Sequence, residues 1–291
     1  MSLVDSEFWS ALTWTERVAC AVGATFARTR AGRRAATFYQ DHVSVPVWNK
    51  TLDDRMHVHG LEHLPRDRSF IFAANHRSYF DLYAVLLATW HHFDQSPHLY
   101  CPVRTTFFYE RPLGVALNVA VCANAMYPPV FRDDRGRVLN QRAVDLAVEL
   151  LETDPRTVLA MHPEGKRNKG DDPYSYLPPK PGVGRIALRA GAPVVPVYVG
   201  GLPAKFGALV KERVSGKGTP VRVRLGAPVP LADLYADADD PAAQREAAER
   251  TMGAIAALGE EDRAFVAGLS RGDRSADSPR STTTTPTTTP A

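Results

Sequence analysis

Short apolar runs alternate with helical stripes from about residue 52 onward, and this alternation restricts the fold more than any other feature of the chain. The runs typical of strands are MHVHG (56–60), SFIFAA (69–74), HLYCPV (98–103), VAVCANAM (119–126), TVLAMH (157–162) and PVVPVYVG (193–200). Between them, apolar residues recur at helical spacing at 79–90, 138–151 and 182–191, where Gly191 is placed to end the last helix. Strands separated by helices predict an α/β fold with a mixed, largely parallel sheet flanked by helices.

The rest of the chain divides around this α/β region. TPVRVRLG (219–226) alternates polar and apolar residues, which predicts an edge or half-buried strand, and 241–270 predicts one or two closing helices. The final stretch is rich in Thr and Pro and holds almost nothing apolar to bury. We therefore expect three segments: a helical segment at 1–51, one domain at 52–270 and a disordered tail at 271–291.

Residues 8–48 are compatible with helices and interleave aromatic with basic side chains, among them Trp14, Phe38 and the arginines from Arg17 to Arg34. On an amphipathic segment this mixture suits a membrane surface, with rings at the headgroup level and guanidinium groups on lipid phosphates. A helical pair packed on the domain explains the pattern equally well, and the two interpretations are compatible. The longest apolar run, VACAVGATFA (18–27), is shorter than the ~20 residues of a spanning helix, and no basic stretch leads it. We expect neither a transmembrane helix nor a secretory signal.

Composition limits the class of partner. A formal net charge of +3 over 291 residues is too small to argue for nucleic acid, yet basic residues cluster at 28–34, 132–137 and 166–169. Such clusters suit anionic small molecules or an anionic membrane surface, although a solvated positive face has the same pattern. The cysteines are too few for a disulfide framework, which favours a reducing, cytoplasmic setting. We expect them to be buried packing residues: Cys20, Cys101 and Cys122.

The first motif loop, NHRSYFD (75–81), leaves the predicted strand SFIFAA directly. Loops at strand ends are where functional residues gather in sheets of this kind. His76 and Asp81 are five positions apart, ~140° around a continuous helix, so a hydrogen bond between them requires a turn, and Ser78 is expected to cap the helix that follows. Asp81 would then orient His76, which could act as general base on a hydroxyl group. The plainer alternative is a polar loop in which both side chains only cap backbone groups.

The second motif loop, HPEGKRN (162–168), follows the predicted strand TVLAM. A proline and Gly165 interrupt the regular backbone, while Glu164, Lys166 and Arg167 crowd one short turn. Such crowding of cations is costly unless they meet an anion, and the planar guanidinium group of Arg167 suits a phosphate. Glu164 would orient these cations or bind an acceptor hydroxyl. An exposed charged turn is the alternative.

Other histidines raise the question of a metal site. Alternation places His57 and His59 on one strand face, and further histidines are His63, His91 and His92. No carboxylate or cysteine completes a convincing ligand set, so we predict that the protein binds no metal.

Four segments resemble, in this order, the sequence blocks of the glycerolipid acyltransferase family: NHRSYFD, YPPVFRDDRG (127–136), HPEGKRN and GAPVVPVYV (191–199). The resemblance spans roughly residues 58–200, and its first and third blocks are the specific ones. It implies that residues 52–270 form an acyltransferase domain, with His76 as general base and Asp81 as its partner. It also implies roles in substrate binding, on the acceptor for Arg132, Glu164, Gly165, Lys166 and Arg167, and nearer the acyl donor for Pro196.

This chain departs from the family pattern in the second and third blocks. Where better-known members have Phe-Pro-Glu-Gly-Thr-Arg-Ser, it has His162, Lys166 and Asn168 at the first, fifth and seventh places. The second block carries YPPVF before its arginine, in place of apolar residues and a glycine. These differences lie in the expected acceptor pocket, whereas the pair of His76 and Asp81 is intact.

The resemblance implies an O-acyltransferase that moves a fatty acyl group from acyl-CoA or acyl-ACP to a hydroxyl of a lysophospholipid-type acceptor, such as lysophosphatidate. It implies direct transfer, without an acyl-enzyme and without a cofactor. Two alternatives stay open. One is the same chemistry on a glycolipid, a carotenoid or another hydroxylated metabolite, and the other is a lipid-binding module that has lost catalysis, against which the intact pair argues.

The expected partners follow from this chemistry. They are the acyl thioester, with acyl carrier protein where that protein carries the chain, the lipid acceptor and an anionic membrane surface, but no nucleic acid. We expect the protein in the cytoplasm, peripherally associated with the inner face of the cell membrane.

Overall fold

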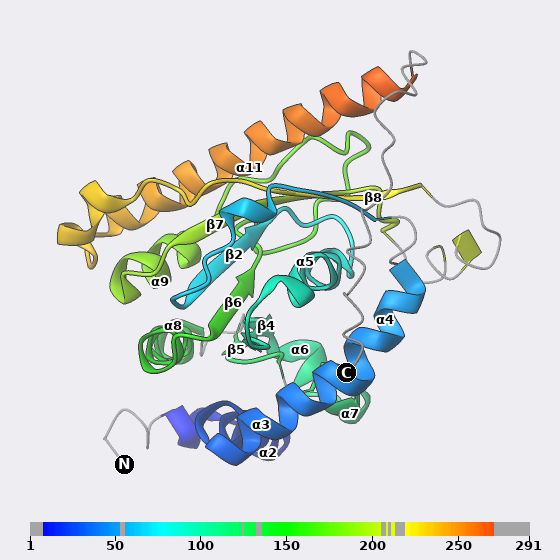
Figure 1. Cartoon of the computed structure of the whole chain (residues 1–291). Coiled ribbons are helices and arrows are strands. Elements are labelled where there is room, and N and C mark those ends of the chain that lie inside the picture. Colours follow the sequence, from blue (N-terminus) through cyan, green and yellow to red (C-terminus); the bar gives the residue numbers. More distant parts are fainter. Residues whose placement is uncertain are drawn as a thin grey trace, which may run out of the picture.

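The computed structural model describes residues 8–52, 56–120, 122–123, 125–131, 136–204, 208, 211–212 and 219–270 (Figure 1). Its centre is a six-stranded sheet in the order β1-β8-β7-β2-β6-β3. The strand bounds are Met56–His59 for β1, Phe70–Ala74 for β2, His98–Tyr100 for β3, Thr157–Met161 for β6, Val194–Gly200 for β7 and Val221–Leu225 for β8. Neighbouring strands run parallel, except that β7 and β8 are antiparallel. The predicted mixed, largely parallel sheet is confirmed.

Helices cover both faces of this sheet (Figure 1). The α-helices of the described part of the chain include α2 (Trp14–Arg28), α3 (Arg30–Tyr39), α4 (Val45–Leu52), α5 (Asp81–Thr89), α6 (Thr105–Phe108), α7 (Pro112–Ala120), α8 (Gly136–Thr153), α9 (Gly182–Ala190) and α11 (Pro241–Ser270), of which α2, α3, α6 and α7 lie below this sheet in Figure 1. Alternate residues of β2 divide between the faces. Phe70 and Phe72 share a buried cluster with α5, whereas Ile71 and Ala73 share one with α8, α9 and α11. Burial on both faces explains why this strand is a continuous apolar run.

The predicted N-terminal helices are present as α2 and α3, which continue through a π-helix at Gln40–Ser44 into α4. Part of this segment packs on the domain, because Cys20 and Ala27 are buried. Another part faces solvent, with Trp14 76% and Phe38 64% exposed. None of the helices in the described part of the chain is long and apolar enough to cross a membrane.

The strand predicted at 119–126 is wrong. Helix α7 runs to Ala120, and the described residues that follow it in this stretch form turns and irregular backbone. Pro112 opens α7 at the one helical position that tolerates proline. An apolar run of this length does not distinguish a strand from a helix, and here the helix start decides. The chain next forms a strand at β5 (Pro129–Val130), which pairs with β4 (Val103–Arg104) in a separate small sheet.

The edge or half-buried strand predicted at 219–226 is also wrong in its placement. β8 lies between β1 and β7 and is buried throughout. Its two polar residues, Arg222 and Arg224, pair with Asp262 of α11 through Nε–Oδ1 distances of 2.9 and 3.3 Å. The polar residues in the alternating pattern of β8 therefore face a buried carboxylate rather than water. The one or two helices expected at 241–270 are the single helix α11, and the tail expected at 271–291 lies outside the described residues.

Candidate active site

The two motif loops leave neighbouring parallel strands, β2 and β6, at the same edge of the sheet. The side chain of Asn75 ties the end of β2 to β7 through two hydrogen bonds with the backbone of Val199, at 2.7 and 2.9 Å. The backbone nitrogen of Asn168 donates to the backbone oxygen of His76 at 2.7 Å, which joins one loop to the other. The residues of both loops therefore lie in one place.

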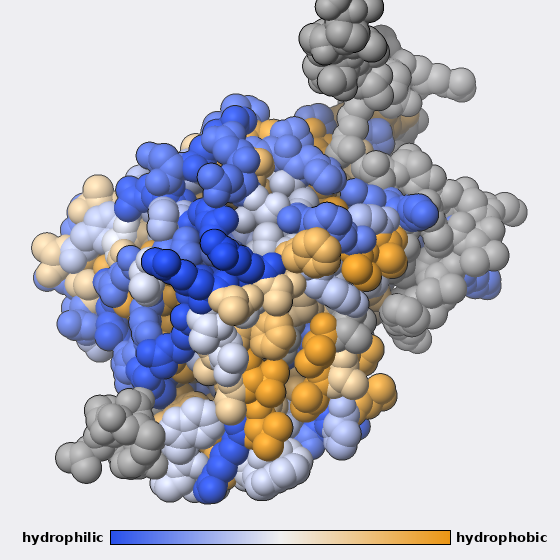
Figure 2. All heavy atoms as spheres, turned by 60° about the horizontal axis from the view of Figure 1, so that its bottom comes forward, coloured by the Kyte–Doolittle hydropathy of each residue, from blue (hydrophilic) through white to orange (hydrophobic). Residues whose placement is uncertain are grey.

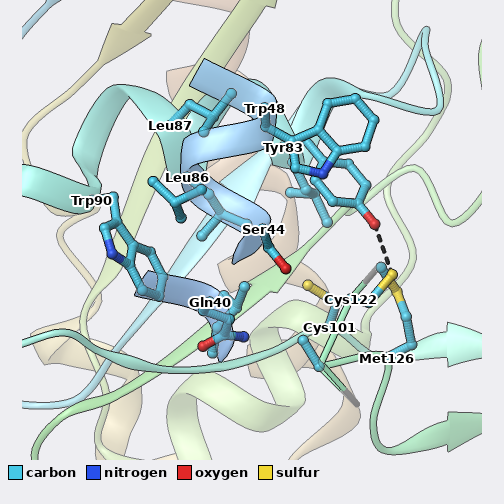
Figure 3. A pocket seen from close by; sticks show the side chains of 14 residues that line it. Gln40, Ser44, Trp48, Tyr83, Leu86, Leu87, Trp90, Cys101, Cys122 and Met126 are labelled. Carbon is cyan, nitrogen blue, oxygen red and sulfur yellow. Dashed lines mark hydrogen bonds between the residues drawn. The ribbon is translucent and has the colours of Figure 1, made fainter. Parts of the chain in front are cut away.

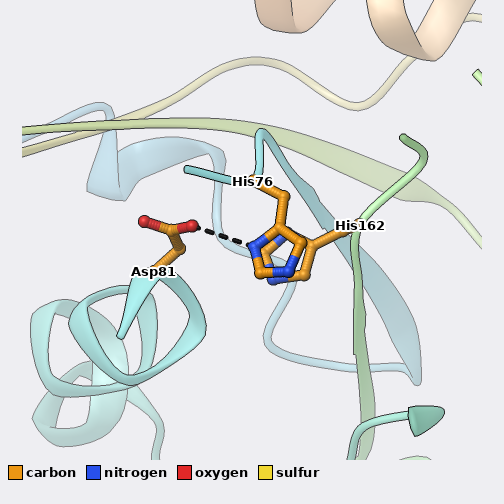
Figure 4. Close-up of side chains that lie close together, drawn as sticks. All are labelled: His76, Asp81 and His162. Carbon is orange, nitrogen blue, oxygen red and sulfur yellow. Dashed lines mark hydrogen bonds and ion pairs between the residues drawn. The ribbon is translucent and has the colours of Figure 1, made fainter. Parts of the chain in front are cut away.

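His76 and Asp81 meet across a tight turn (Figure 4), with His76 Nδ1 at 3.1 Å from Asp81 Oδ2. The same oxygen accepts the backbone N–H groups of Arg77 and Ser78, each at 2.8 Å. Asp81 is the first residue of α5 and only 1% exposed, so its carboxylate gathers these donors at the helix N-terminus. The expected cap at Ser78 is wrong, because the helix begins three residues later and the Ser78 hydroxyl donates to the oxygen of Pro203 at 2.8 Å.

At neutral pH His76 is in the unprotonated form that a general base requires. Burial, and then the neighbouring charges of Arg167 and Arg104, lower the pKa of His76 to about 3. Burial raises the pKa of Asp81 to about 6, against the opposing effect of the backbone N–H groups and nearby cations. At pH 7 His76 is therefore neutral and Asp81 is mostly ionised. Since Nδ1 donates to the carboxylate, Nε2 is the nitrogen that can take a proton.

Glu164 connects the two motif loops. Its carboxylate is 1% exposed and accepts the backbone N–H of His76 at 2.8 Å and that of Leu177 at 2.9 Å. Both oxygens thus bind backbone groups, and the expected role of Glu164 in binding the acceptor stays a prediction. Gly165 follows at φ +66°, a conformation that favours glycine, and a Cβ there would lie 3.2 Å from Lys180 Cγ.

The cations of the second motif loop lie at the surface of the site. The guanidinium carbon of Arg167 is 3.7 Å from the ring centroid of Tyr79, and Arg167 donates to the oxygen of Ala204 at 2.9 Å. Lys166 is exposed. Arg132 lies outside the described residues, so its expected contact with the acceptor stays a prediction, as do those of Gly165, Lys166 and Arg167.

Arg104 is a residue of this site that the sequence did not reveal. It ends β4, donates to the backbone oxygen of Gly165 at 2.7 Å, and contributes to the lowered pKa of His76. Its place depends on the small sheet of β4 and β5, whose short strands leave no clear periodicity. The available signal was a cation directly after the predicted strand at 98–103, the kind of position that His76 also occupies.

His162 is a second such residue, noticed in the sequence only as a departure from the family pattern. Its ring stacks on that of His76, with centroids 3.7 Å apart and planes 9° apart (Figure 4). One nitrogen or oxygen from each of His76, Asp81 and His162 lies within 4.8 Å of the others. The lone pairs of two parallel, stacked rings run side by side rather than converge on one ion, so this geometry favours a stack. That the protein binds no metal stays a prediction.

Two other features singled out in the sequence lie away from the motif loops. Pro196 is buried in the middle of β7, opposite Ala73, where it belongs to the sheet that supports the site. Its expected place near the acyl donor stays a prediction. The rings of His57 and His59 lie against Phe265 of α11, with centroid distances of 6.4 and 5.7 Å.

A small apolar pocket, with a cavity volume of about 40 Å³, lies beside α5 (Figure 3). Leu82 and Tyr83, which directly follow Asp81, line it together with Trp48 of α4. The remaining lining residues are Gln40, Ser44, Val45, Leu86, Leu87, Trp90, Leu99, Cys101, Cys122, Ala125 and Met126. The Tyr83 hydroxyl is 2.7 Å from Cys122 Sγ, and all three cysteines are buried, as expected. Such a lining suits a hydrocarbon chain.

Comparison with known proteins agrees with this geometry. The family model described as Acyltransferase matches residues 55–200, half of the chain, and this stretch contains both motif loops. The crystal structure of the 1-acyl-sn-glycerophosphate (LPA) acyltransferase PlsC from Thermotoga maritima has a similar fold, with a TM-score of 0.51. The two chains are 21% identical, and the match covers 90% of this chain and 95% of that one. No curated protein matches the chain significantly. The chain belongs to the acyltransferase family, and its motif loops resemble those of the glycerolipid acyltransferases.

Proposed function

We propose that this acyltransferase moves a fatty acyl group from an acyl thioester, on coenzyme A or acyl carrier protein, to a hydroxyl of a lysophospholipid-type acceptor such as lysophosphatidate. The observation that carries the proposal is the hydrogen bond of 3.1 Å between His76 and Asp81, beside the charges of Arg104 and Arg167. A neutral base next to cations suits a hydroxyl on a phosphorylated molecule. The similar fold of a 1-acyl-sn-glycerophosphate acyltransferase supports the same acceptor class.

In the proposed reaction, the acceptor's O–H bond breaks as its proton passes to His76 Nε2, and its oxygen bonds to the thioester carbonyl carbon. Asp81 stabilises the resulting imidazolium through Nδ1–H. The tetrahedral oxyanion then collapses, the carbon–sulfur bond breaks, and the departing thiolate takes the proton from His76. One ester and one free thiol result, with no acyl-enzyme and no cofactor.

Arg104 and Arg167 would hold the phosphate of the acceptor, with Lys166 and Arg132 adding charge. Each of the first two guanidinium groups already donates to a backbone oxygen of the site, that of Gly165 or that of Ala204. Their positions are therefore largely set before the acceptor arrives, which lowers the entropic cost of binding.

The apolar pocket between α4 and α5 would take the acyl chain. Two of its lining residues, Leu82 and Tyr83, are the next residues after Asp81 on the same helix. The pocket therefore begins within one helical turn of the catalytic pair. A chain lying in it would bring its thioester toward His76.

An anionic membrane surface is the proposed docking partner. Figure 2 shows hydrophobic side chains gathered on the face that α2, α3, α4 and α7 form at the bottom of Figure 1. The large apolar side chains exposed on these helices include Trp14, Phe38, Val47 and Leu113. Arg17 and Arg34 are exposed on the same helices and suit lipid phosphates. The corresponding location is the inner face of the cell membrane, bound peripherally.

The test is mass spectrometry of the lipids that the purified chain makes from one acyl-CoA and a panel of acceptors: lysophosphatidate, lysophosphatidylglycerol, a glycolipid and a carotenoid alcohol. We expect phosphatidate from lysophosphatidate, with released coenzyme A. His76→Ala should lower the rate at least about 100-fold, because general-base catalysis contributes that much. Arg104→Ala should raise KM for lysophosphatidate.

Other outcomes would decide against this function. Transfer only to the non-phosphorylated acceptors would support the alternative acceptor class. No coenzyme A release with any acceptor would support a lipid-binding module. A folded His76→Ala variant with the wild-type rate would exclude His76 as the base.

A further inference from the structure

His162 covers one face of the proposed general base, at a position where better-known members of the family carry phenylalanine. Its ring lies 3.7 Å from the His76 ring and 9° from parallel to it. It directly follows Met161, the last residue of β6, and so leaves the sheet beside the end of β2. There its Nδ1–H donates to the backbone oxygen of Ala74 at 2.9 Å. This side-chain hydrogen bond thus continues the pairing of β2 and β6 by one residue beyond the last backbone pair, Ala73 and Met161.

This hydrogen bond distinguishes His162 from a phenylalanine. A phenyl ring could stack on His76, but it has no N–H with which to hold itself in place. With Nδ1–H donated to Ala74, the orientation of the His162 ring is fixed. Because this fixed ring covers one face of the His76 ring, His76 keeps one ring orientation. In that orientation its Nδ1 reaches Asp81.

The stacked pair also has a defined charge. Burial, and then the charge of His76, lower the pKa of His162 to about 4, so the two rings do not carry two charges near pH 7. The other charged groups that act on the pair are Asp81 on α5, Arg104 on β4 and Arg167 in the second motif loop. His162 is therefore a neutral, polarisable surface when His76 becomes an imidazolium.

We infer that His162 is a positioning residue of this acyltransferase and acts through His76. It holds the plane of the general base by stacking, and it is held itself by the hydrogen bond to Ala74, so that Nε2 of His76 stays directed at the acceptor hydroxyl. The inference rests on the proposed function, because it gives His162 a part in the same proton transfer. The cost of losing His162 should fall on kcat rather than on KM, since the ring acts on the base and not on the acceptor.

Three variants separate the stack from the hydrogen bond. His162→Phe keeps an aromatic ring without the N–H, His162→Asn keeps an N–H near the place of Nδ1 without the ring, and His162→Leu loses both. With acyl-CoA and lysophosphatidate, we expect kcat to stay within about 3-fold in the Phe variant, to fall about 10-fold in the Asn variant and about 100-fold in the Leu variant, as a misplaced catalytic group would. KM for the acceptor should not change.

The pH profile gives a second measure that a merely structural role would not move. The acid limb of kcat/KM belongs to the coupled pair of His76 and Asp81. In the Leu variant, water that reaches the uncovered ring should raise the proton affinity of His76 and move this limb to higher pH. In the Phe variant it should stay where it is in the wild type.

Nitrogen NMR of the histidine rings in the ¹⁵N-labelled protein gives a readout that does not depend on turnover. We expect His76 to show one neutral tautomer, protonated at Nδ1, in the wild type and the Phe variant, and averaged tautomers in the other two. If the wild type acylates nothing but His76 still responds in this way, the proposed function fails while the positioning of His76 stands.

The inference is overturned if the Leu variant keeps the wild-type kcat, pH profile and His76 tautomer. It is equally overturned if kcat falls as far in the Phe variant as in the Leu variant, because stacking would then not be the property that positions His76. Should the Leu variant fail to fold, the other two decide: a lower kcat in the Asn variant than in the Phe variant supports the inference, and equal values overturn it.

Discussion

Glu164 Oε1 accepts the backbone N–H of His76 at 2.8 Å, while Glu164 Oε2 accepts that of Leu177 at 2.9 Å. One buried carboxylate thereby joins the first motif loop, the second motif loop and the segment that follows it. The base is held through its backbone by Glu164 and through its ring by Asp81. The two buried carboxylates thus have different roles. Glu164 holds the backbone of the loops, and Asp81 orients the imidazole ring of His76.

Replacing Glu164 by glutamine should weaken both the fold and the catalysis. The variant keeps one carbonyl oxygen but turns an NH₂ group toward a backbone N–H, which leaves a buried donor without an acceptor. We expect the free energy of unfolding to fall by about 1–3 kcal/mol and kcat to fall about 10-fold. Urea denaturation and steady-state kinetics measure these effects. Lys166→Gln, exposed in the same loop, is the control and should leave the unfolding free energy unchanged. An E164Q variant as stable as the wild type would contradict the connecting role.

Stability should fall as the pH drops from 7 to 5. The folded-state pKa values of His76 and His162, about 3 and about 4, lie below the ordinary 6.5, so unfolding takes up protons on both rings in this range. Asp81 acts in the opposite direction, because its folded-state pKa of about 6 exceeds the ordinary 3.8 and unfolding releases its proton. The net uptake of about one proton corresponds to about 1.4 kcal/mol lost per pH unit.

Urea denaturation at pH 5, 6 and 7 measures this slope. His162→Phe removes one of the two proton uptakes, and the remaining one should nearly cancel against Asp81. The contribution of the site to the slope should therefore vanish in that variant. Equal slopes in the two proteins would contradict the assignment of a neutral His162.

Narrowing the apolar pocket should shorten the acyl chain that the enzyme prefers. Leu86→Phe adds a ring to the wall between α4 and α5. We expect kcat/KM to fall about 10-fold with a palmitoyl donor, because displaced methylene groups lose burial worth about 0.8 kcal/mol each, and to change little with a decanoyl donor. Kinetics over a series of acyl-CoA lengths measures the shift. Leu269→Phe, exposed on α11, is the matched control. An equal loss at all lengths would place the acyl chain elsewhere.

Binding to membranes should depend on the two most exposed N-terminal aromatic side chains. In sedimentation with vesicles that contain phosphatidylglycerol, Trp14→Ser and Phe38→Ser should each weaken binding about 10-fold, since each removes apolar area from the lipid contact. Raising the salt concentration should weaken binding as well, because the arginines of α2 and α3 would be screened. Leu269→Ser, exposed on α11 at the opposite side of the molecule, serves as control (Figure 1). Unchanged binding in both aromatic variants would rule out this face.

Single residues show how far the sequence predicts this molecule. His76 and Asp81 were predictable because strand end, turn and helix start are local features of one short segment. Ser78 was not the cap, because its hydroxyl accepts the backbone N–H of Phe80 at 3.3 Å in a turn before the helix, which begins only at Asp81. The strand at 219–226 was expected at an edge or half-buried, because nothing local shows that Arg222 pairs with Asp262, 40 residues further along the chain. Arg104 was missed for the same kind of reason, since only the pairing of β4 with β5 brings it to the site.

The position of β8 has a consequence for how the protein is made. β1 is an edge strand that joins the sheet by pairing with β8, which itself pairs with β7. A nascent chain that has left the ribosome only as far as Gly200 already contains both motif loops, but β1 has no neighbour and one side of β7 is an open edge. The enzyme therefore acquires its reactive residues before its sheet is complete, and that edge of β7 stays unpaired until the last strand emerges.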